Sequence, residues 1–136
     1  MALEVKGLTA GYGPVTVLHG VDFRAEPGQI TCLMGRNGVG KSTCLKCLMG
    51  LVPATEGSIK LDGAALQSLP AHEVPRQGLA YVPQGRRLFG PLTVAENLAV
   101  GGLVRGNDRA TLERVLTLFP RLRERADAPA GVLSGG

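Results

Sequence analysis

The sequence predicts an α/β fold organised around one glycine-rich loop. Strand-like and helix-like segments alternate up to Gln84, as they do in α/β folds. An apolar run, Gln29–Met34, leads directly into the glycine-rich segment, and residues with helical spacing follow it over Ser42–Met49. This order of strand, loop and helix is the basis of the fold prediction.

The chain begins with a predicted β-hairpin. Leu3–Ala10 and Val15–Ala25 both read as extended segments, and Gly11, Gly13 and Pro14 between them predict a turn. We therefore expect two antiparallel strands at the N-terminus.

The central strand and helix come next. Gln29–Met34 is short enough for a strand and too apolar for the edge of a sheet, so we place it centrally in a parallel sheet. The helix predicted over Ser42–Met49 is stopped by Gly50 and Pro53. A buried strand that enters a helix through a short loop thus forms the centre of the predicted fold.

Shorter elements follow this unit. Gly57–Leu61 is predicted to be a strand closed by the turn Asp62-Gly63. His72–Gln77 is predicted to be a turn of helix, and Leu79–Val82 another strand. Up to this point the chain keeps the alternation of strand and helix.

Beyond Gln84 the pattern becomes helical. Thr93–Val100 and Asn107–Leu118 both read as helices, and glycines separate them. We therefore expect an α/β core over residues 1–84, with an N-terminal β subdomain, and a helical subdomain over residues 85–136.

Composition and charge exclude several classes of protein. At 136 residues, with 44% hydrophobic and 19% charged side chains, the chain resembles a soluble globular domain. The formal net charge is +4, but the basic residues are spread from Lys6 to Arg125 without a run of five, so no nucleic-acid partner is expected. No segment approaches the roughly 18 apolar residues of a membrane span, and no signal peptide is evident, which predicts a cytoplasmic protein.

The cysteines and histidines indicate neither a metal site nor a redox site. Cys32, Cys44 and Cys47 are an odd number in one apolar stretch, so we expect reduced core side chains. Cys44 and Cys47 form a C-x-x-C, but they lie on the helix after the loop and lack the context of a thioredoxin motif. His19 and His72 have no partners at metal-ligand spacing and are expected to be structural or on the surface.

Residues 35–42 have the spacing of a phosphate-binding loop, G-x-x-x-x-G-K-[ST]. Glycines let the backbone approach phosphate oxygens at the start of a helix, whose dipole favours anions. Lys41 is expected to reach the β and γ phosphates, and the Ser42 hydroxyl to bind Mg²⁺. A chance glycine-rich turn is the alternative, but the predicted strand and helix on either side favour the phosphate loop. The residues expected to bind the nucleotide are Gly35, Arg36, Asn37, Gly38, Val39, Gly40, Lys41, Ser42 and Thr43.

Further segments occur in the order found in ATP-binding cassette (ABC) proteins. Tyr12 precedes the loop, Gln84 ends the segment Tyr81-Val82-Pro83-Gln84, and Leu92–Leu98 and Leu133–Gly136 follow. With the loop, these segments make the whole chain resemble the N-terminal part of an ABC ATPase. The resemblance implies a P-loop NTPase (RecA-like) core with an N-terminal antiparallel β subdomain and an incomplete helical subdomain.

The resemblance also implies a role for each of these residues. The Tyr12 ring would stack on the adenine of ATP, and Gln84 would contact Mg²⁺ and the attacking water. Ser134, Gly135 and Gly136 would contact the γ-phosphate bound by a second ATPase subunit, which implies a head-to-tail dimer. The structural alternatives are a hairpin cap for Tyr12 and an ordinary strand-end residue for Gln84.

Within the family, Met34–Lys41 and Tyr81–Phe89 are most similar to ATPase subunits of urea and branched-chain amino-acid importers. Arg86 and Arg87 lie where such subunits meet their membrane permease, although exposed arginines are often simply solvated. The similarity implies a subunit at the inner face of the membrane that powers solute import through permease partners. The alternatives are a nucleotide-binding module without hydrolysis and a non-transport ABC ATPase.

Several residues that the family needs for hydrolysis do not occur in this sequence. The family's Walker B strand, its catalytic glutamate and its switch histidine follow the signature, and this chain has no apolar run that ends in Asp-Glu. We therefore expect the 136 residues to be part of a longer chain, with weak ATP binding and negligible turnover on their own. Without the Walker B strand, which would lie near the centre of the sheet, apolar faces of the sheet are expected to be exposed.

Overall fold

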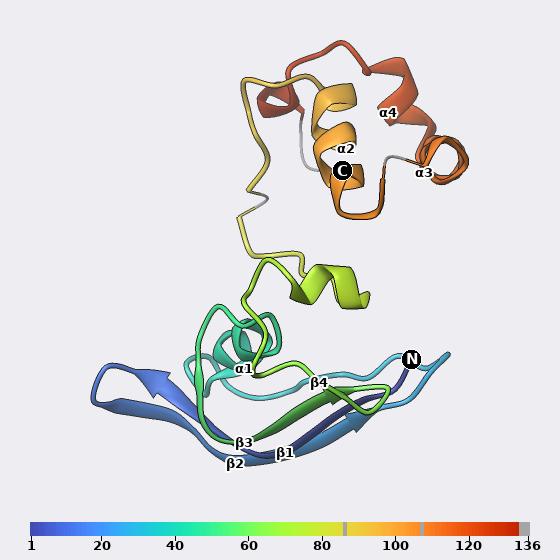
Figure 1. The fold of residues 1–136 in the computed structure, drawn as a ribbon. Coiled ribbons are helices and arrows are strands. Elements are labelled where there is room, and N and C mark those ends of the chain that lie inside the picture. Colours follow the sequence, from blue (N-terminus) through green and yellow to red (C-terminus); the bar gives the residue numbers. More distant parts are fainter. Residues whose placement is uncertain (86, 107, 134–136) are drawn as a thin grey trace. The chain divides into compact units, whose positions relative to one another are not determined.

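The computed structural model describes residues 1–85, 87–106 and 108–133. It comprises two compact units, Met1–Tyr81 and Val82–Gly136. The first contains a β-sheet and helix α1, and the second contains the remaining α-helices (Figure 1). No helix among the described residues has the length and apolarity needed to cross a membrane.

The first unit is a small antiparallel sheet with one α-helix packed beside it. The strand order in the sheet is β2-β1-β3-β4. The elements are β1 (Leu3–Tyr12), β2 (Val15–Ala25), α1 (Lys41–Leu48), β3 (Ala54–Leu61), β4 (Ala64–Ala65) and the 3₁₀ turn η1 (Val74–Gln77).

The predicted N-terminal hairpin is confirmed. Strands β1 and β2 pair antiparallel, from Leu3 opposite Ala25 to Tyr12 opposite Val15. Strand β1 runs two residues further than the predicted end at Ala10, because the residues before the turn also join the ladder. The hairpin therefore carries Tyr12 at its tip.

A bulge at Gly7 sets which side chains of β1 reach the core. The register of β1 shifts between Val5 and Leu8, and Gly7 has a φ of 58°. Val5 and Leu8 are three residues apart, yet both are buried, because the extra residue of a bulge restores the same face of the strand. Opposite the bulge, a Cβ on Gly57 would collide with the Gly7 carbonyl oxygen, so only glycine fits there.

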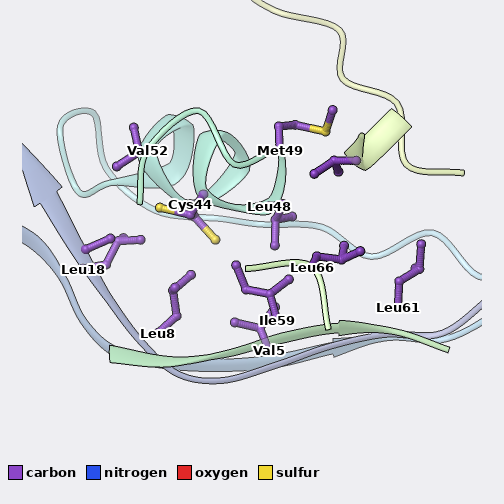
Figure 2. Packing of buried hydrophobic residues seen from close by; sticks show 13 residues of the cluster. Val5, Leu8, Leu18, Cys44, Leu48, Met49, Val52, Ile59, Leu61 and Leu66 are labelled. Carbon is purple, nitrogen blue, oxygen red and sulfur yellow. The ribbon is translucent and has the colours of Figure 1, made fainter. Parts of the chain in front are cut away.

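The core of the first unit lies between α1 and the sheet. Figure 2 shows Cys44 and Leu48 pointing from α1 toward the sheet, where Leu8 and Ile59 face them. The buried cluster consists of Val5, Leu8, Ala10, Leu18, Cys44, Cys47, Leu48, Met49, Val52, Ile59, Leu61, Leu66 and Val74.

The prediction that Cys44 and Cys47 are reduced core residues is confirmed. Both are free and buried. Burial raises the pKa of the Cys44 thiol, and burial and then the neighbouring Cys44 raise the pKa of Cys47 to about 11. Both side chains are therefore neutral thiols at pH 7, which suits packing better than redox chemistry.

The predicted parallel strand Gln29–Met34 is not formed in the described chain, and neither is the strand predicted over Leu79–Val82. Gln29–Met34 lies outside the sheet, and Ile30 and Met34 are 98% and 84% exposed. A strand exists only beside a hydrogen-bonding neighbour, and the ladders of the described residues of this unit all belong to the antiparallel sheet. Cys32, which was expected in the core, is exposed for the same reason.

The second unit consists of short helices. Its elements are α2 (Val94–Gly102), η2 (Leu103–Arg105), α3 (Arg109–Leu118), α4 (Pro120–Glu124) and η3 (Ala130–Val132). Both predicted helices are present, but α2 continues through the two glycines that were expected to follow it. Helix α3 begins at Arg109 because Asp108 is its N-cap, and the predicted start, Asn107, lies outside the described residues.

Side chains cap both longer helices of this unit. Thr93 and Glu96 form a reciprocal capping box at α2, in which each side chain accepts a hydrogen bond from the other residue's backbone N–H. The Asp108 carboxylate accepts hydrogen bonds from the backbone N–H groups of Ala110 and Thr111 at α3. These caps satisfy backbone donors that a helix leaves unpaired at its start.

Candidate nucleotide-binding site

The predicted phosphate loop leads directly into α1. Gly40 is the N-cap of the helix with a φ of 100°, and its carbonyl oxygen accepts the first helical hydrogen bond from Cys44 N–H at 2.8 Å. A Cβ on Gly40 would lie 2.7 Å from Cδ2 of Leu18 on β2. Gly40 is therefore required both by its left-handed backbone and by its packing against the hairpin.

Lys41 folds back across the loop. Its Nζ donates hydrogen bonds to the carbonyl oxygens of Gly35 and Arg36, each at 2.7 Å. An ammonium group has three donors, so one remains for another acceptor. The positive charge thus lies at the mouth of the loop and at the N-terminus of α1, where the helix dipole favours an anion and the first turn has no acidic residue.

The two hydroxyl residues that follow Lys41 face different surroundings. Ser42 is exposed, whereas Thr43 is only 6% exposed, and its Oγ1 lies 3.5 Å from the Tyr12 hydroxyl. Ser42 has an accessible oxygen beside the lysine, which fits the chemistry of a Mg²⁺ ligand next to phosphate. Thr43 contributes to the packing of the helix against the hairpin tip.

The described residues offer no dedicated metal cage. No group of three or more His, Cys, Asp or Glu side chains in this part of the chain could hold a metal ion. A Mg²⁺ ion that binds with a nucleotide takes few protein ligands, because phosphates and water supply the rest. The donor set around the loop therefore fits a Mg²⁺ that arrives with phosphates.

The fold brings Tyr12 to the helix that begins at the loop. Tyr12 ends β1, and the residue is 48% exposed. Besides the contact with Thr43, the ring has the Lys46 ammonium 5.8 Å from its centroid. An aromatic face is thus available beside the loop-helix unit, although the residues lie far apart in sequence.

The other predicted site residues lie in the second unit or outside the described residues. Gln84 is exposed, in a turn where Gly85 has a φ of 85°, and it belongs to the second unit, whereas the loop belongs to the first. The signature residues Ser134, Gly135 and Gly136 lie outside the described residues, and so does Arg86. Arg87 is exposed and has a φ of 46°.

Asn97 organises the segment after Gln84, a role that was not predicted from the sequence. The Asn97 Oδ1 accepts a hydrogen bond from Phe89 N–H at 3.0 Å. Its Nδ2 donates to the carbonyl oxygens of Phe89, Leu92 and Thr93 at 3.1, 3.3 and 2.9 Å. Asparagine is a poor helix former, and its presence inside α2 was the available signal for such a role.

His19 and His72 lie on the surface, as expected. The Nε2 atom of His72 is 3.4 Å from a carboxylate oxygen of Glu73, and both side chains are solvent-accessible. An exposed pair of this kind contributes little to stability.

Known proteins resemble the chain in both sequence and structure. The chain is 46% identical over 127 residues to the high-affinity branched-chain amino acid transport ATP-binding protein BraG of Pseudomonas aeruginosa, covering 92% of the chain and 54% of BraG. It is 38% identical to the probable branched-chain amino acid transport ATP-binding protein LivF of Archaeoglobus fulgidus, covering 98% of the chain and 58% of LivF. The chain thus spans little more than half the length of these relatives.

A solved structure described as the ATP-binding subunit of an ABC transporter matches the fold. The TM-score is 0.85 at 35% identity, over 98% of this chain and 56% of the other. The predicted fold class, an α/β P-loop NTPase, is confirmed by this match. The family model described as "ABC transporter" matches residues 18–136. The chain belongs to the ABC transporter family, and within it to the ATP-binding proteins.

Proposed function

We propose that this protein binds ATP with Mg²⁺ as the ATP-binding subunit of an importer. The observation that carries the proposal is the loop itself, in which the Lys41 ammonium lies at the mouth of a glycine-rich turn that opens α1. The ATP-binding relatives and the aromatic ring of Tyr12 beside α1 support the same conclusion.

Each residue of the loop has a distinct task in this proposal. The backbone of residues 35–40 wraps the phosphates, and Gly40 allows the turn into the helix. Lys41 presents its charge to the β and γ phosphates, Ser42 supplies a hydroxyl to the metal, and Thr43 anchors the helix against Tyr12. When bound, Mg²⁺ neutralises phosphate charge and orients the triphosphate.

Replacing Lys41 tests the site directly. Lys41→Ala removes a charge-assisted contact of about 2 kcal/mol, so ATP affinity is expected to fall by about 30-fold. Isothermal titration of the chain with Mg-ATP measures the change. The matched control is Lys60→Ala, because Lys60 is exposed on β3 and should not affect binding. Equal affinity of the Lys41→Ala variant and the unmodified protein would refute the assignment.

Hydrolysis requires more than these residues supply. We propose that Gln84 contacts Mg²⁺ and the attacking water, and that Ser134, Gly135 and Gly136 act on ATP held by a second subunit in a head-to-tail dimer. Residues 1–136 contain no Asp-Glu that follows an apolar strand, so these residues alone should release phosphate from Mg-ATP at a negligible rate. A phosphate-release assay that detects steady turnover would contradict this part of the proposal.

The two compact units divide between Tyr81 and Val82, three residues before the boundary proposed here, and they support two parts with different tasks. We propose that residues 1–84 form the nucleotide-binding core and that residues 85–136 form a helical subdomain up to the signature. The segment after Gln84, to which Arg86 and Arg87 belong in the sequence, would meet a membrane permease. This arrangement holds the subunit at the inner face of the cell membrane, with no nucleic-acid partner. Co-purification with a permease from detergent-solubilised membranes tests this location.

We propose branched-chain amino acids as the transported solutes. The names of the BraG and LivF relatives support branched-chain amino acids over urea. The sequence motifs alone were similar to ATPase subunits of importers for both kinds of solute. Uptake of radiolabelled leucine should fall in source cells that carry the Lys41→Ala substitution, while urea uptake stays constant. Loss of urea uptake alone would reverse the assignment.

A further inference from the structure

Two side chains of α1 hold the ring of Tyr12 from different sides. The Thr43 Oγ1 lies 3.5 Å from the Tyr12 hydroxyl, and the Lys46 Nζ lies over the ring at 5.8 Å from its centroid. Thr43 and Lys46 are three residues apart on α1 and therefore share one face of the helix. The ring is thus held at its hydroxyl and across one face.

The hairpin alone leaves the direction of the ring open. Tyr12 pairs with Val15 at the tip of the hairpin, which fixes its backbone but not its side-chain torsion. A cation above an aromatic face is attracted by the ring quadrupole, so Lys46 stabilises one orientation of the ring. Tyr12 as a whole residue remains 48% exposed, and a planar group can stack on ring surface that α1 does not cover.

Lys46 is too far along the helix to act as a second Lys41. The two residues are five positions apart, or about 7.5 Å along the helix axis. Lys41 contacts the loop carbonyls, whereas Lys46 contacts the ring of Tyr12. The contacts with the loop and the contact with the ring are therefore made by different lysines of the same helix.

We propose that Lys46 is a positioning residue for the nucleotide base. Its ammonium holds one face of Tyr12 against α1 and so turns the opposite face toward the base of a nucleotide whose phosphates lie at residues 35–42. This inference rests on the proposed nucleotide binding and adds to it a residue that acts through Tyr12.

The test separates base binding from phosphate binding. Lys46→Met keeps the apolar length of the side chain and removes the charge. We expect the affinity for Mg-ATP to fall by about two- to fivefold, and the affinity for inorganic tripolyphosphate to stay constant. Lys46→Arg, which retains a cation, should restore ATP affinity. In a Tyr12→Leu background, Lys46→Met should have no further effect.

Several controls keep the result interpretable. The backbone oxygen of Lys46 accepts the hydrogen bond from Leu51 N–H at 2.9 Å, so a side-chain change leaves the end of the helix intact. If Lys46→Met nevertheless unfolds the chain, Lys46→Gln replaces it. Lys60→Met on β3 controls for the loss of a positive charge.

The outcomes distinguish this inference from the proposed function. Absence of ATP binding by the unmodified protein would overturn both. If Lys41→Ala weakens ATP binding but Lys46→Met leaves the ratio of ATP to tripolyphosphate affinity unchanged, only the positioning role fails. Tighter ATP binding by Lys46→Met would also overturn it, because the lysine would then compete with the base for the same face of the ring.

Discussion

The two units of this chain are stabilised in different ways. In the first, side chains from the sheet and α1 form one buried apolar cluster. In the second, α3 and α4 contain no buried residue, and Val94 and Ala130 are its buried hydrophobic residues among those the structure describes. Hydrogen bonds at helix ends and the Asn97 contacts stabilise this second unit instead. The phosphate loop thus belongs to the unit with the packed core, which fixes α1 beneath it.

The largest expected effect comes from opening the core of the first unit. Leu8 is fully buried beneath α1, so Leu8→Ala should lower the free energy of unfolding by about 2–5 kcal/mol. Denaturant unfolding measures this change. Leu112→Ala on α3 is the matched control, since Leu112 is exposed, and its effect should stay below about 1 kcal/mol. Similar losses for both variants would show that the two units do not differ in this way.

A smaller effect is expected at the cap of α2. Thr93→Ala removes the side-chain acceptor for Glu96 N–H, which should lower the stability of the second unit by about 1 kcal/mol. Amide hydrogen exchange of α2 is the appropriate measurement, because it reports local opening. Thr117→Ala is the control, since the Thr117 hydroxyl donates to a carbonyl inside α3 and caps no helix start. Unchanged exchange in α2 would mean that the capping box contributes nothing.

Acid should affect the second unit through two capping carboxylates. The backbone N–H of Thr93, and to a smaller extent its hydroxyl, donate hydrogen bonds that lower the pKa of Glu96 below the ordinary 4.5. Hydrogen bonds from Thr111 and Ala110 likewise lower the pKa of Asp108 below 3.8. A lowered pKa means that the ionised form is favoured in the folded chain. This stabilisation is therefore complete above the ordinary pKa values and is lost as the pH falls through the lowered ones.

NMR amide signals of α2 and α3 between pH 7 and pH 2 follow this loss directly. In a Glu96→Gln, Asp108→Asn double variant, the part of the acid dependence that comes from the caps should disappear. The part that comes from Glu113, whose pKa is lowered by the hydrogen bond and charge of Arg123, should remain. The amide signal of Ile59 on β3 serves as the internal reference, because Ile59 is buried and its N–H donates to the side-chain amide oxygen of Gln67, which does not titrate. Equal acid sensitivity of this amide would contradict the comparison.

Local signals made much of the fold predictable. The hairpin followed from two extended runs around a glycine and proline turn, and α1 followed from the loop motif and helical spacing. Gln29–Met34 was predicted wrongly because apolarity shows that a segment suits burial but not which strand lies beside it. Hydrogen-bonding partners of strands are nonlocal, and no periodicity reveals them.

The site was likewise predictable only where its residues are close together in the sequence. Lys41 and Ser42 follow from a contiguous motif, and their neighbourhood is fixed by the turn into α1. The contact of Lys46 with Tyr12 joins a helix to the tip of a distant strand, so no local pattern reveals it. Asn97 was also missed, because the motif that contains it shows the helix but not the four hydrogen bonds that its side chain makes with the preceding segment.

The Lys41 side chain donates hydrogen bonds to the carbonyl oxygens of Gly35 and Arg36, and these bonds close residues 35–41 into a noncovalent macrocycle, a closed ring of chain atoms. A segment held as a ring samples fewer conformations, so the entropy of ordering opposes ligand binding less. In Lys41→Ala that ring is open, and the loop gains freedom at the same time as it loses a charge. Part of the affinity lost by this variant is therefore entropic, and it should appear in the temperature dependence of binding as well as in the dissociation constant.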